Sequence, residues 1–195
     1  MILDKPSIRK EVRQKRRGLS SSEKNIAEKK LLRSLRQSQT FQAAQHVAIY
    51  HTHDGEISTE LLVKDLLKRK KTLYLPVLHP FKKGHLGFVR FDKNTRMIKN
   101  RFGILEPVFR LENSINPAFL NWVCMPLVAF DAQGNRLGMG GGFYDRTFSF
   151  VRHREVKPKL IGLAYELQKY PKLPTETWDI PLAAIATDKK LYAFS

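Results

Sequence analysis

The residues best suited to chemistry lie in one glycine-rich stretch between Asp131 and Arg146. It reads DAQGNRLGMGGGFYDR and holds five glycines between Gly134 and Gly142. Glycine loses more backbone entropy on folding than any other residue, so such a cluster indicates positions at which a Cβ atom would not fit. A glycine loop that leads from a strand into a helix can direct several backbone N–H groups at one anion. The stretch therefore predicts a phosphate-binding loop.

Charged residues beside this loop favour a nucleotide site over a purely structural turn. Arg136 can bind phosphate oxygens, and Asp145 can bind a divalent metal ion. The loop is not a Walker A motif, because no Gly-Lys-Ser/Thr follows it. Phe143 occupies the third glycine position of the dinucleotide-binding pattern G-x-G-x-x-G when counted from Gly138. The glycines alone fit a tight turn about equally well, and the two charged residues favour the nucleotide.

The elements before the loop predict the sheet that positions it. The nearly continuous apolar run at residues 122–130 predicts a strand covered on both faces. A β-rich segment at residues 46–51, a helix with an apolar stripe from Ile57 to Leu67 and a strand at residues 72–78 follow the order of a βαβ unit. Such a unit joins parallel strands. The sequence therefore predicts an α/β fold with a mostly parallel sheet.

The remaining segments complete this expected fold. A basic helix is expected after Pro6, and Ser20 begins a capping box that starts a second helix. Residues 101–116 contain Gly, Pro and Asn with weak periodicity and predict a loop, while residues 142–153 predict a helix. Further strands are expected at residues 84–92, 159–165, 183–187 and 191–194. We expect residues 1–195 to form a single domain.

The composition narrows the class of protein. With 195 residues, 42% of them hydrophobic, the chain can form one sizeable core. No run is long enough to span a membrane, and the N-terminal segment is charged from residue 4 onward, unlike a secretory signal. Cys124 is the only cysteine and lies in an apolar run, so we expect a buried thiol without a disulfide. The expected location is the cytoplasm.

The net charge of +17 predicts attraction to polyanions. The excess of Lys and Arg is concentrated in the first 40 residues, including Arg13–Arg17. These residues fit a solvated helical face, a phosphate site or an arm that binds nucleic acid. No RNA- or DNA-binding signature occurs, which makes a nucleic-acid-binding protein the weaker alternative. A second alternative is a sugar-phosphate isomerase or an acyl-CoA-handling enzyme on a related α/β scaffold, which would act without ATP.

The motif RLGMGGGFYDR, preceded by PLVAFDAQGN, resembles the signature of the 5-formyltetrahydrofolate cyclo-ligases, also called 5,10-methenyltetrahydrofolate synthetases. The segments RRGLS, HVAIYHTHDGEIST, LPVLHP and ETWDIPL follow in the order of that family, and the bacterial members are most similar. The resemblance implies an α/β sandwich whose twisted, mainly parallel sheet is flanked by helices. It also implies ATP-dependent cyclisation of 5-formyltetrahydrofolate to 5,10-methenyltetrahydrofolate, with release of ADP and phosphate. The expected intermediate carries the phosphoryl group on the formyl oxygen as an iminium phosphate.

The resemblance implies roles for individual residues. Contacts to ATP are expected at Lys5, Arg9, Arg136, Leu137, Gly138, Met139, Gly140, Gly141, Gly142, Phe143 and Tyr144. Contacts to the folate are expected at His51, Glu56, Met139, Gly140, Gly141, Gly142 and Phe143. The expected Mg²⁺ ligands are Asp145 and Asp179, and the expected catalytic residues are Arg136, Tyr144 and Asp145. The expected partners are ATP, Mg²⁺ and the folate, with or without a polyglutamate tail, and the expected assembly is a monomer.

Overall fold

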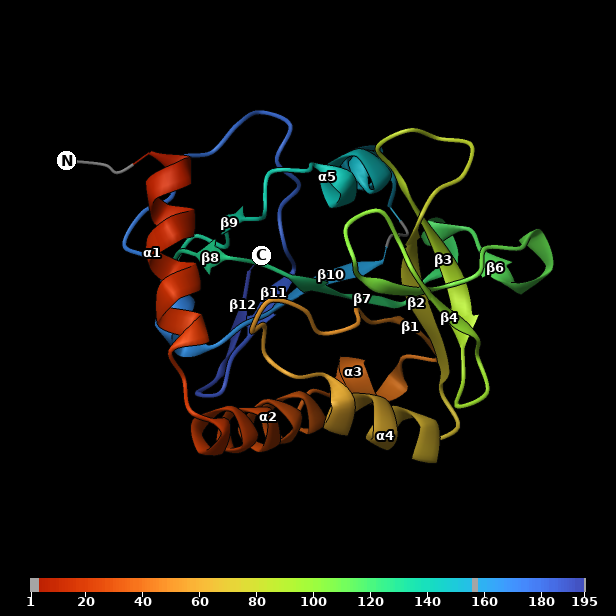
Figure 1. Ribbon diagram of the computed structural model, residues 1–195, viewed down its shortest axis with the longest axis horizontal. Coiled ribbons are helices and arrows are strands. Elements are labelled where there is room, and N and C mark those ends of the chain that lie inside the picture. Colours follow the sequence, from red (N-terminus) through yellow and green to blue (C-terminus); the bar gives the residue numbers. More distant parts are fainter. Residues whose placement is uncertain (1–3, 156–157, 195) are drawn as a thin grey trace.

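A central sheet of eight strands organises the protein (Figure 1). The computed structural model describes residues 4–155 and 158–194. The strands of the sheet are β1 (His46–Ala48), β2 (Thr72–Leu78), β3 (Leu86–Phe91), β6 (Ser114–Ile115), β7 (Trp122–Pro126), β10 (Lys159–Leu163), β11 (Ala184–Ala186) and β12 (Leu191–Ala193). Their spatial order is β12-β11-β10-β7-β1-β2-β3-β6. The five strands from β11 to β2 pair in parallel, and β12, β3 and β6 pair antiparallel at the edges. The mainly parallel sheet is confirmed.

Helices cover both faces of this sheet, which confirms the predicted α/β architecture. On one face lie α2 (Ser21–Arg36), α3 (Gln39–Ala43) and α4 (Glu60–Lys68), below the sheet in Figure 1. On the other lie α5 (Phe143–Thr147) and the 3₁₀ segment η3 (Ser149–His153). Side chains of a strand alternate between the faces. Val47 joins the core cluster that lies between the sheet and helices α2 and α4, and Ala48 joins the cluster on the opposite face of the sheet. No helix of the described residues is long and apolar enough to cross a membrane.

Helix α1 (Lys5–Arg17) packs apart from the other helices. Asp4 caps its start, since its Oδ1 accepts a hydrogen bond from the Ser7 amide at 2.8 Å, and Pro6 occupies the first turn. Buried Ile8 and Val12 contact a small antiparallel hairpin formed by β8 (Ala129–Phe130) and β9 (Arg136–Leu137). This hairpin leads directly into the glycine loop, so α1 lies beside the candidate phosphate-binding residues.

Some local predictions were wrong. Residues 122–130 do not form one strand, because β7 ends at Pro126, whose missing N–H cannot continue the ladder, and β8 then pairs with β9. Residues 101–116 are not only a loop: they include β5 (Leu105–Pro107), which pairs with β4 (Met97–Lys99), and β6. The helix predicted at residues 142–153 ends at Thr147, because Phe148 leaves helical geometry and is fully buried against Phe88 at 5.6 Å between ring centroids.

Cys124 lies in β7, in the core cluster between the sheet and helices α2 and α4, with 1% of its surface exposed. Burial raises the pKa of its thiol to about 12. A thiol that remains protonated is a poor nucleophile. The buried position expected for Cys124 is confirmed.

Candidate active site

A cavity of about 1250 Å³ opens where the loops that follow β1 and β7 leave the sheet. Within the sheet, the next strand after β1 is β2, on one side, and the next strand after β7 is β10, on the other side. The two neighbouring strands therefore flank the point at which the strand order reverses, and the loops that follow them diverge. Ligands of open α/β sheets bind in the crevice formed there. The loop after β1 carries His51 and Glu56, and the chain after β7 carries the glycines.

The site residues expected from the sequence all line this one cavity. They are Lys5, Arg9, His51, Glu56, Arg136, Leu137, Gly138, Met139, Gly140, Gly141, Gly142, Phe143, Tyr144, Asp145 and Asp179. They come from α1, from the two loops at the reversal point and from the segment before β11. The structure thus brings together residues that are widely separated in the sequence.

The glycine loop adopts a backbone that other residues rarely adopt. Gly140 has φ +94° and Gly142 has φ +63°, both in the left-handed region. A Cβ atom on Gly140 would come within 3.3 Å of the Arg9 guanidinium. Within the described part of the chain, the backbone N–H groups of residues 138–142 donate no hydrogen bond. Unpaired amides on an exposed loop beside arginines are suited to bind an anion.

Arg136 and Asp145 form an ion pair in the wall of the cavity. Arg136 Nη2 donates to Asp145 Oδ1 at 2.5 Å, and only 6% of the arginine side chain is exposed. The same Oδ1 accepts a hydrogen bond from the Ile180 amide at 3.2 Å. The Nε atom of Arg136 is buried and has no partner among the described residues. Asp145 therefore holds the arginine in place and lies beside Asp179, the residue before Ile180.

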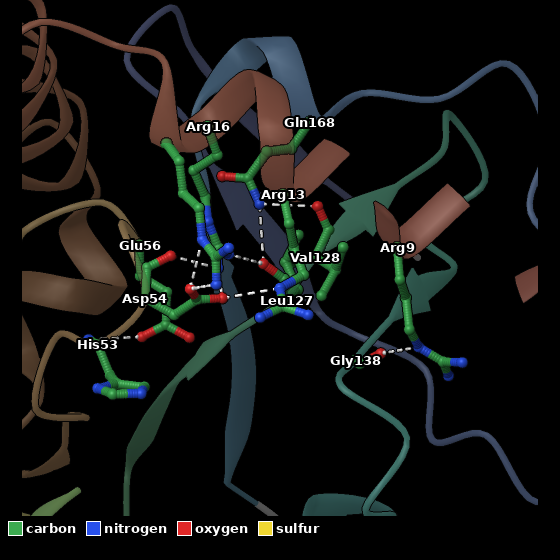
Figure 2. A network of polar contacts seen from close by, with 11 residues as sticks. Arg9, Arg13, Arg16, His53, Asp54, Glu56, Leu127, Val128, Gly138 and Gln168 are labelled. Atoms are coloured by element: carbon green, nitrogen blue, oxygen red, sulfur yellow. Dashed lines mark hydrogen bonds and ion pairs between the residues drawn. The ribbon is translucent and has the colours of Figure 1, made fainter. Parts of the chain in front are cut away.

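The two cations at the start of α1 also reach the cavity. Lys5 and Arg9 are four residues apart and therefore share one face of the helix. Lys5 Nζ lies 3.2 Å from Glu176 Oε1 and 3.9 Å from Asp179 Oδ2. Arg9 Nε donates to the carbonyl oxygen of Gly138 at 2.9 Å (Figure 2). Its terminal nitrogens lie beside Gly140, where Nη2 would be 3.3 Å from an added Cβ. The helix thus places two positive charges at the glycine loop and at the Asp179 segment.

The carboxylates of Asp145 and Asp179 could hold a magnesium ion. Asp145 Oδ2 and Asp179 Oδ1 accept no hydrogen bond from residues 4–155 or 158–194. In the same described ranges, no group of three or more His, Cys, Asp or Glu side chains is placed to enclose a metal. Mg²⁺ usually takes one or two protein carboxylates and completes its shell with phosphate oxygens and water. A pair of aspartates meets that requirement.

Burial raises the pKa values of both Glu56 and Tyr144. Burial raises the pKa of the Glu56 carboxyl to about 7, although a hydrogen bond from the His53 amide at 3.0 Å and the charge of Arg16 oppose the shift. Burial and the nearby Glu56 raise the pKa of the Tyr144 hydroxyl well above its usual range. At neutral pH the cavity therefore holds a carboxyl close to its titration midpoint and a tyrosine that keeps its proton.

Some lining residues were not predicted. Phe102, at the turn between β4 and β5, meets Phe143 edge to face with ring centroids 6.0 Å apart. Trp178, with 64% of its surface exposed, lines the cavity beside Asp179. A signal was present, because exposed aromatic residues in loops often mark binding surfaces. Residues 101–116, which include Phe102 and β5, were predicted as a loop, so Phe102 had no expected place near the glycines.

Comparison with known proteins agrees with this geometry. The sequence model of the 5-formyltetrahydrofolate cyclo-ligase family matches residues 2–188. A 5-formyltetrahydrofolate cyclo-ligase of Haemophilus influenzae is 43% identical over 175 residues, which cover 90% of this chain and 92% of the relative. The chain belongs to the 5-formyltetrahydrofolate cyclo-ligase family.

Two further relatives support the assignment. The 5-formyltetrahydrofolate cyclo-ligase of Escherichia coli K12 is 38% identical over 181 residues, which cover 93% of this chain and 98% of the relative. The solved structure of Aquifex aeolicus 5,10-methenyltetrahydrofolate synthetase superimposes with a TM-score of 0.81 at 32% identity, over 97% of this chain and 92% of that one. The chain is therefore a ligase-family enzyme of folate one-carbon metabolism, as the resemblance implied, and neither alternative considered from the sequence is supported.

Proposed function

We propose that the protein uses ATP to cyclise 5-formyltetrahydrofolate to 5,10-methenyltetrahydrofolate, with release of ADP and phosphate. The observation that carries the proposal is one cavity lined by a glycine loop with unpaired amides, three cations and two aspartates. We also propose that the chain acts as one domain and as a monomer in the cytoplasm.

The phosphates of ATP would bind at the glycine loop. The amides of residues 138–142 offer hydrogen-bond donors, and Lys5, Arg9 and Arg136 surround them with positive charge. The buried Nε of Arg136, which has no hydrogen-bond partner among the described residues, offers a further donor. A bound Mg²⁺, held by Asp145 and Asp179, would neutralise phosphate charge. Such a site acts mainly by alignment and by stabilising charge in the transition state.

The folate would bind on the side of the cavity formed by the loop after β1. Glu56, ionised, can accept hydrogen bonds from the pterin amino group and ring N–H, and His51 lies on the same loop. Phe143 and Met139 offer apolar surface next to the phosphate site. Basic residues at the mouth of the cavity, including Arg146 and Arg152, suit a polyglutamate tail.

The reaction needs two bond exchanges. In the first, the formyl oxygen attacks the γ-phosphorus of ATP, the bond to ADP breaks, and an iminium phosphate forms. In the second, N10 of the folate attacks the formyl carbon, the carbon–oxygen bond breaks, phosphate leaves, and N10 loses its proton. Arg136 stabilises negative charge on the phosphoryl oxygens, and Tyr144, protonated at neutral pH, can donate a hydrogen bond to the leaving oxygen.

The direct test is the formation of methenyltetrahydrofolate, followed by its absorbance, from 5-formyltetrahydrofolate with and without Mg-ATP. We expect product only when the folate, ATP and Mg²⁺ are all present, because the formyl group is a poor electrophile until it is phosphorylated. Controls omit one component at a time or add EDTA. Equal turnover without ATP would contradict the proposal and favour an isomerase-like enzyme.

Folate affinity is expected to depend on pH through Glu56. Its raised pKa of about 7 means that the carboxyl is largely protonated at pH 6 and ionised at pH 8. Because only the ionised form accepts two hydrogen bonds, the Kd for the formylated folate should fall roughly tenfold between pH 6 and pH 8. Fluorescence titration without ATP measures this Kd. Glu56→Gln should bind more weakly and lose the pH dependence, whereas a wild-type Kd that is flat or rises with pH would contradict the assignment.

A further inference from the structure

One arginine of α1 occupies a position at which an apolar residue would be expected. Ile8, Val12 and Arg16 follow at spacings of four residues on the buried face of the helix, and they are 0%, 2% and 1% exposed. Burying a guanidinium is costly unless carboxylate or carbonyl oxygens compensate it. The partners of Arg16 therefore indicate what the protein gains from this charge.

Arg16 binds the loop that follows β1. Its Nη2 donates to the carbonyl oxygen of Asp54 at 2.7 Å and to Asp54 Oδ2 at 3.0 Å (Figure 2). Arg13 Nε donates to the same Oδ2 at 2.8 Å, and Arg17 Nε donates to Oδ1 at 2.7 Å. One carboxylate thus accepts hydrogen bonds from three arginines of one helix.

Asp54 forms the tight turn that presents Glu56. Asp54 and Gly55 have φ values of +50° and +70°, as in a type I′ turn, and the Glu56 amide closes the turn on the His53 carbonyl at 3.0 Å. Glu56 Oε2 in turn accepts a hydrogen bond from the His53 amide at 3.0 Å. The position of the Glu56 carboxyl therefore depends on a turn whose backbone Arg16 binds directly.

The other side of Arg16 faces the chain that leads to the glycines. Its Nη1 lies 3.4 Å from the carbonyl oxygen of Leu127, which also accepts a hydrogen bond from the buried side chain of Gln168 at 2.8 Å. Nearer the start of the helix, Arg9 binds the Gly138 carbonyl. Helix α1 thus contacts both loops that leave the sheet at the reversal point, and Arg16 binds one residue of each, Asp54 and Leu127 (Figure 2).

We propose that Arg16 and Asp54 are positioning residues for the folate end of the cavity, which they serve by holding the His53–Glu56 turn against α1 and the Leu127 segment. This inference rests on the proposed function, in which Glu56 binds the pterin. Asp54 lines the cavity and Arg16 does not, so an effect of Arg16 on the folate must act through the turn. A displacement of about 1 Å in a binding group can lower catalytic efficiency strongly.

Two variants test the positioning role. Asp54→Asn removes the shared charge, and asparagine tolerates the left-handed φ of the turn, so the variant can fold. Arg16→Met keeps most of the buried volume and removes the hydrogen bonds to the turn. The matched control is Asp65→Asn, because Asp65 is a buried carboxylate bound by Arg36 and Arg69 between α2 and α4, away from the cavity.

We expect Asp54→Asn and Arg16→Met to raise both the Kd and the KM for the folate substrate by at least about tenfold. The KM for ATP should change by less than about threefold, and kcat at saturating folate should fall much less than kcat/KM, because the phosphate site and the reacting groups remain. Asp65→Asn should lower the melting temperature without changing either KM. The Kd is measured by titration without ATP and does not depend on turnover.

The outcomes separate this inference from the proposed function. A folded Asp54→Asn protein with a wild-type folate Kd would overturn the positioning role, as would an equal rise in Kd for Asp65→Asn. Loss of ATP and folate affinity together would also overturn it. Wild-type protein that binds the folate but does not cyclise it would overturn only the proposed function. Wild-type protein that binds no folate would overturn both.

Discussion

Replacing Asp145 by asparagine is expected to lower kcat by at least about 100-fold and to raise the Mg²⁺ concentration needed for half-maximal turnover. The carboxylate lies in the wall of the cavity, next in space to the Asp179 segment, and its Oδ2 has no hydrogen bond from the described residues. A carboxylate beside bound phosphates would repel them unless a cation lies between. The amide of asparagine is a poorer ligand and carries no charge, so the metal would bind more weakly.

The melting temperature of Asp145→Asn should fall as well. Asp145 pairs with an arginine whose side chain is only 6% exposed, and an amide compensates that charge less well. The amide oxygen can still accept from Arg136 and from Ile180, so the loss should stay near about 1–3 kcal/mol. Asp65→Asn, which weakens the ion pairs of a buried carboxylate outside the cavity, separates lost stability from lost turnover. Near-normal kcat with an unchanged Mg²⁺ requirement would make Asp145 purely structural and remove the argument for Asp179.

Gly140→Ala should lower kcat/KM for ATP by about 100-fold. Gly140 has φ +94°, where a side chain costs about 1–3 kcal/mol, and the added Cβ would press on the Arg9 guanidinium at 3.3 Å. The loop would relax to another conformation, and ATP would then bind only the fraction that keeps the present one. Displacement of Arg9 removes a further charge-assisted contact of about 1.5–3 kcal/mol. Steady-state kinetics with varied ATP measures the effect.

A glycine elsewhere supplies the matched control for this substitution. Gly103 has φ +75° in the turn between β4 and β5, and an added Cβ would meet no atom within 4 Å. Gly103→Ala therefore introduces similar backbone strain, and its added Cβ meets no atom of the phosphate loop. Its kinetics with ATP should remain close to wild type. If the two variants lose the same kcat/KM for ATP, general strain explains the loss, and the phosphate-loop assignment is not supported.

Local signals predicted much of the fold. The strand at Thr72–Leu78 has the predicted bounds. A run of β-favouring residues between polar turns is enough to predict such a strand. The capping box at Ser20 is also present: the Glu23 amide donates to Ser20 Oγ at 3.2 Å, and Glu23 Oε2 accepts from the Ser20 amide at 2.8 Å. Such motifs need only residues a few positions apart, so the sequence alone can reveal them.

The binding partner of the arginines in α1 could not be predicted in the same way. Arg13–Arg17 fitted a solvated face, a phosphate site or a nucleic-acid arm, and the structure shows instead that three of these arginines bind Asp54. The partner lies 37–41 residues away, and nothing in the helix sequence identifies it. The one available signal was the spacing of Arg16 from Ile8 and Val12, which places it on the buried face.

The packing of α1 also has a consequence for how the enzyme forms during synthesis. The helix is made early, but its contacts to Leu127 and Gly138 span 111 and 129 positions of the chain. A ribosome that adds roughly 5–20 residues per second leaves the helix without these partners for many seconds. Contacts at such separation form late, since loop-closure entropy opposes them. We therefore expect nascent chains to pair β1 with β2 first, and to form the cavity only after its last lining residues, Asp179 and Ile180, have been synthesised.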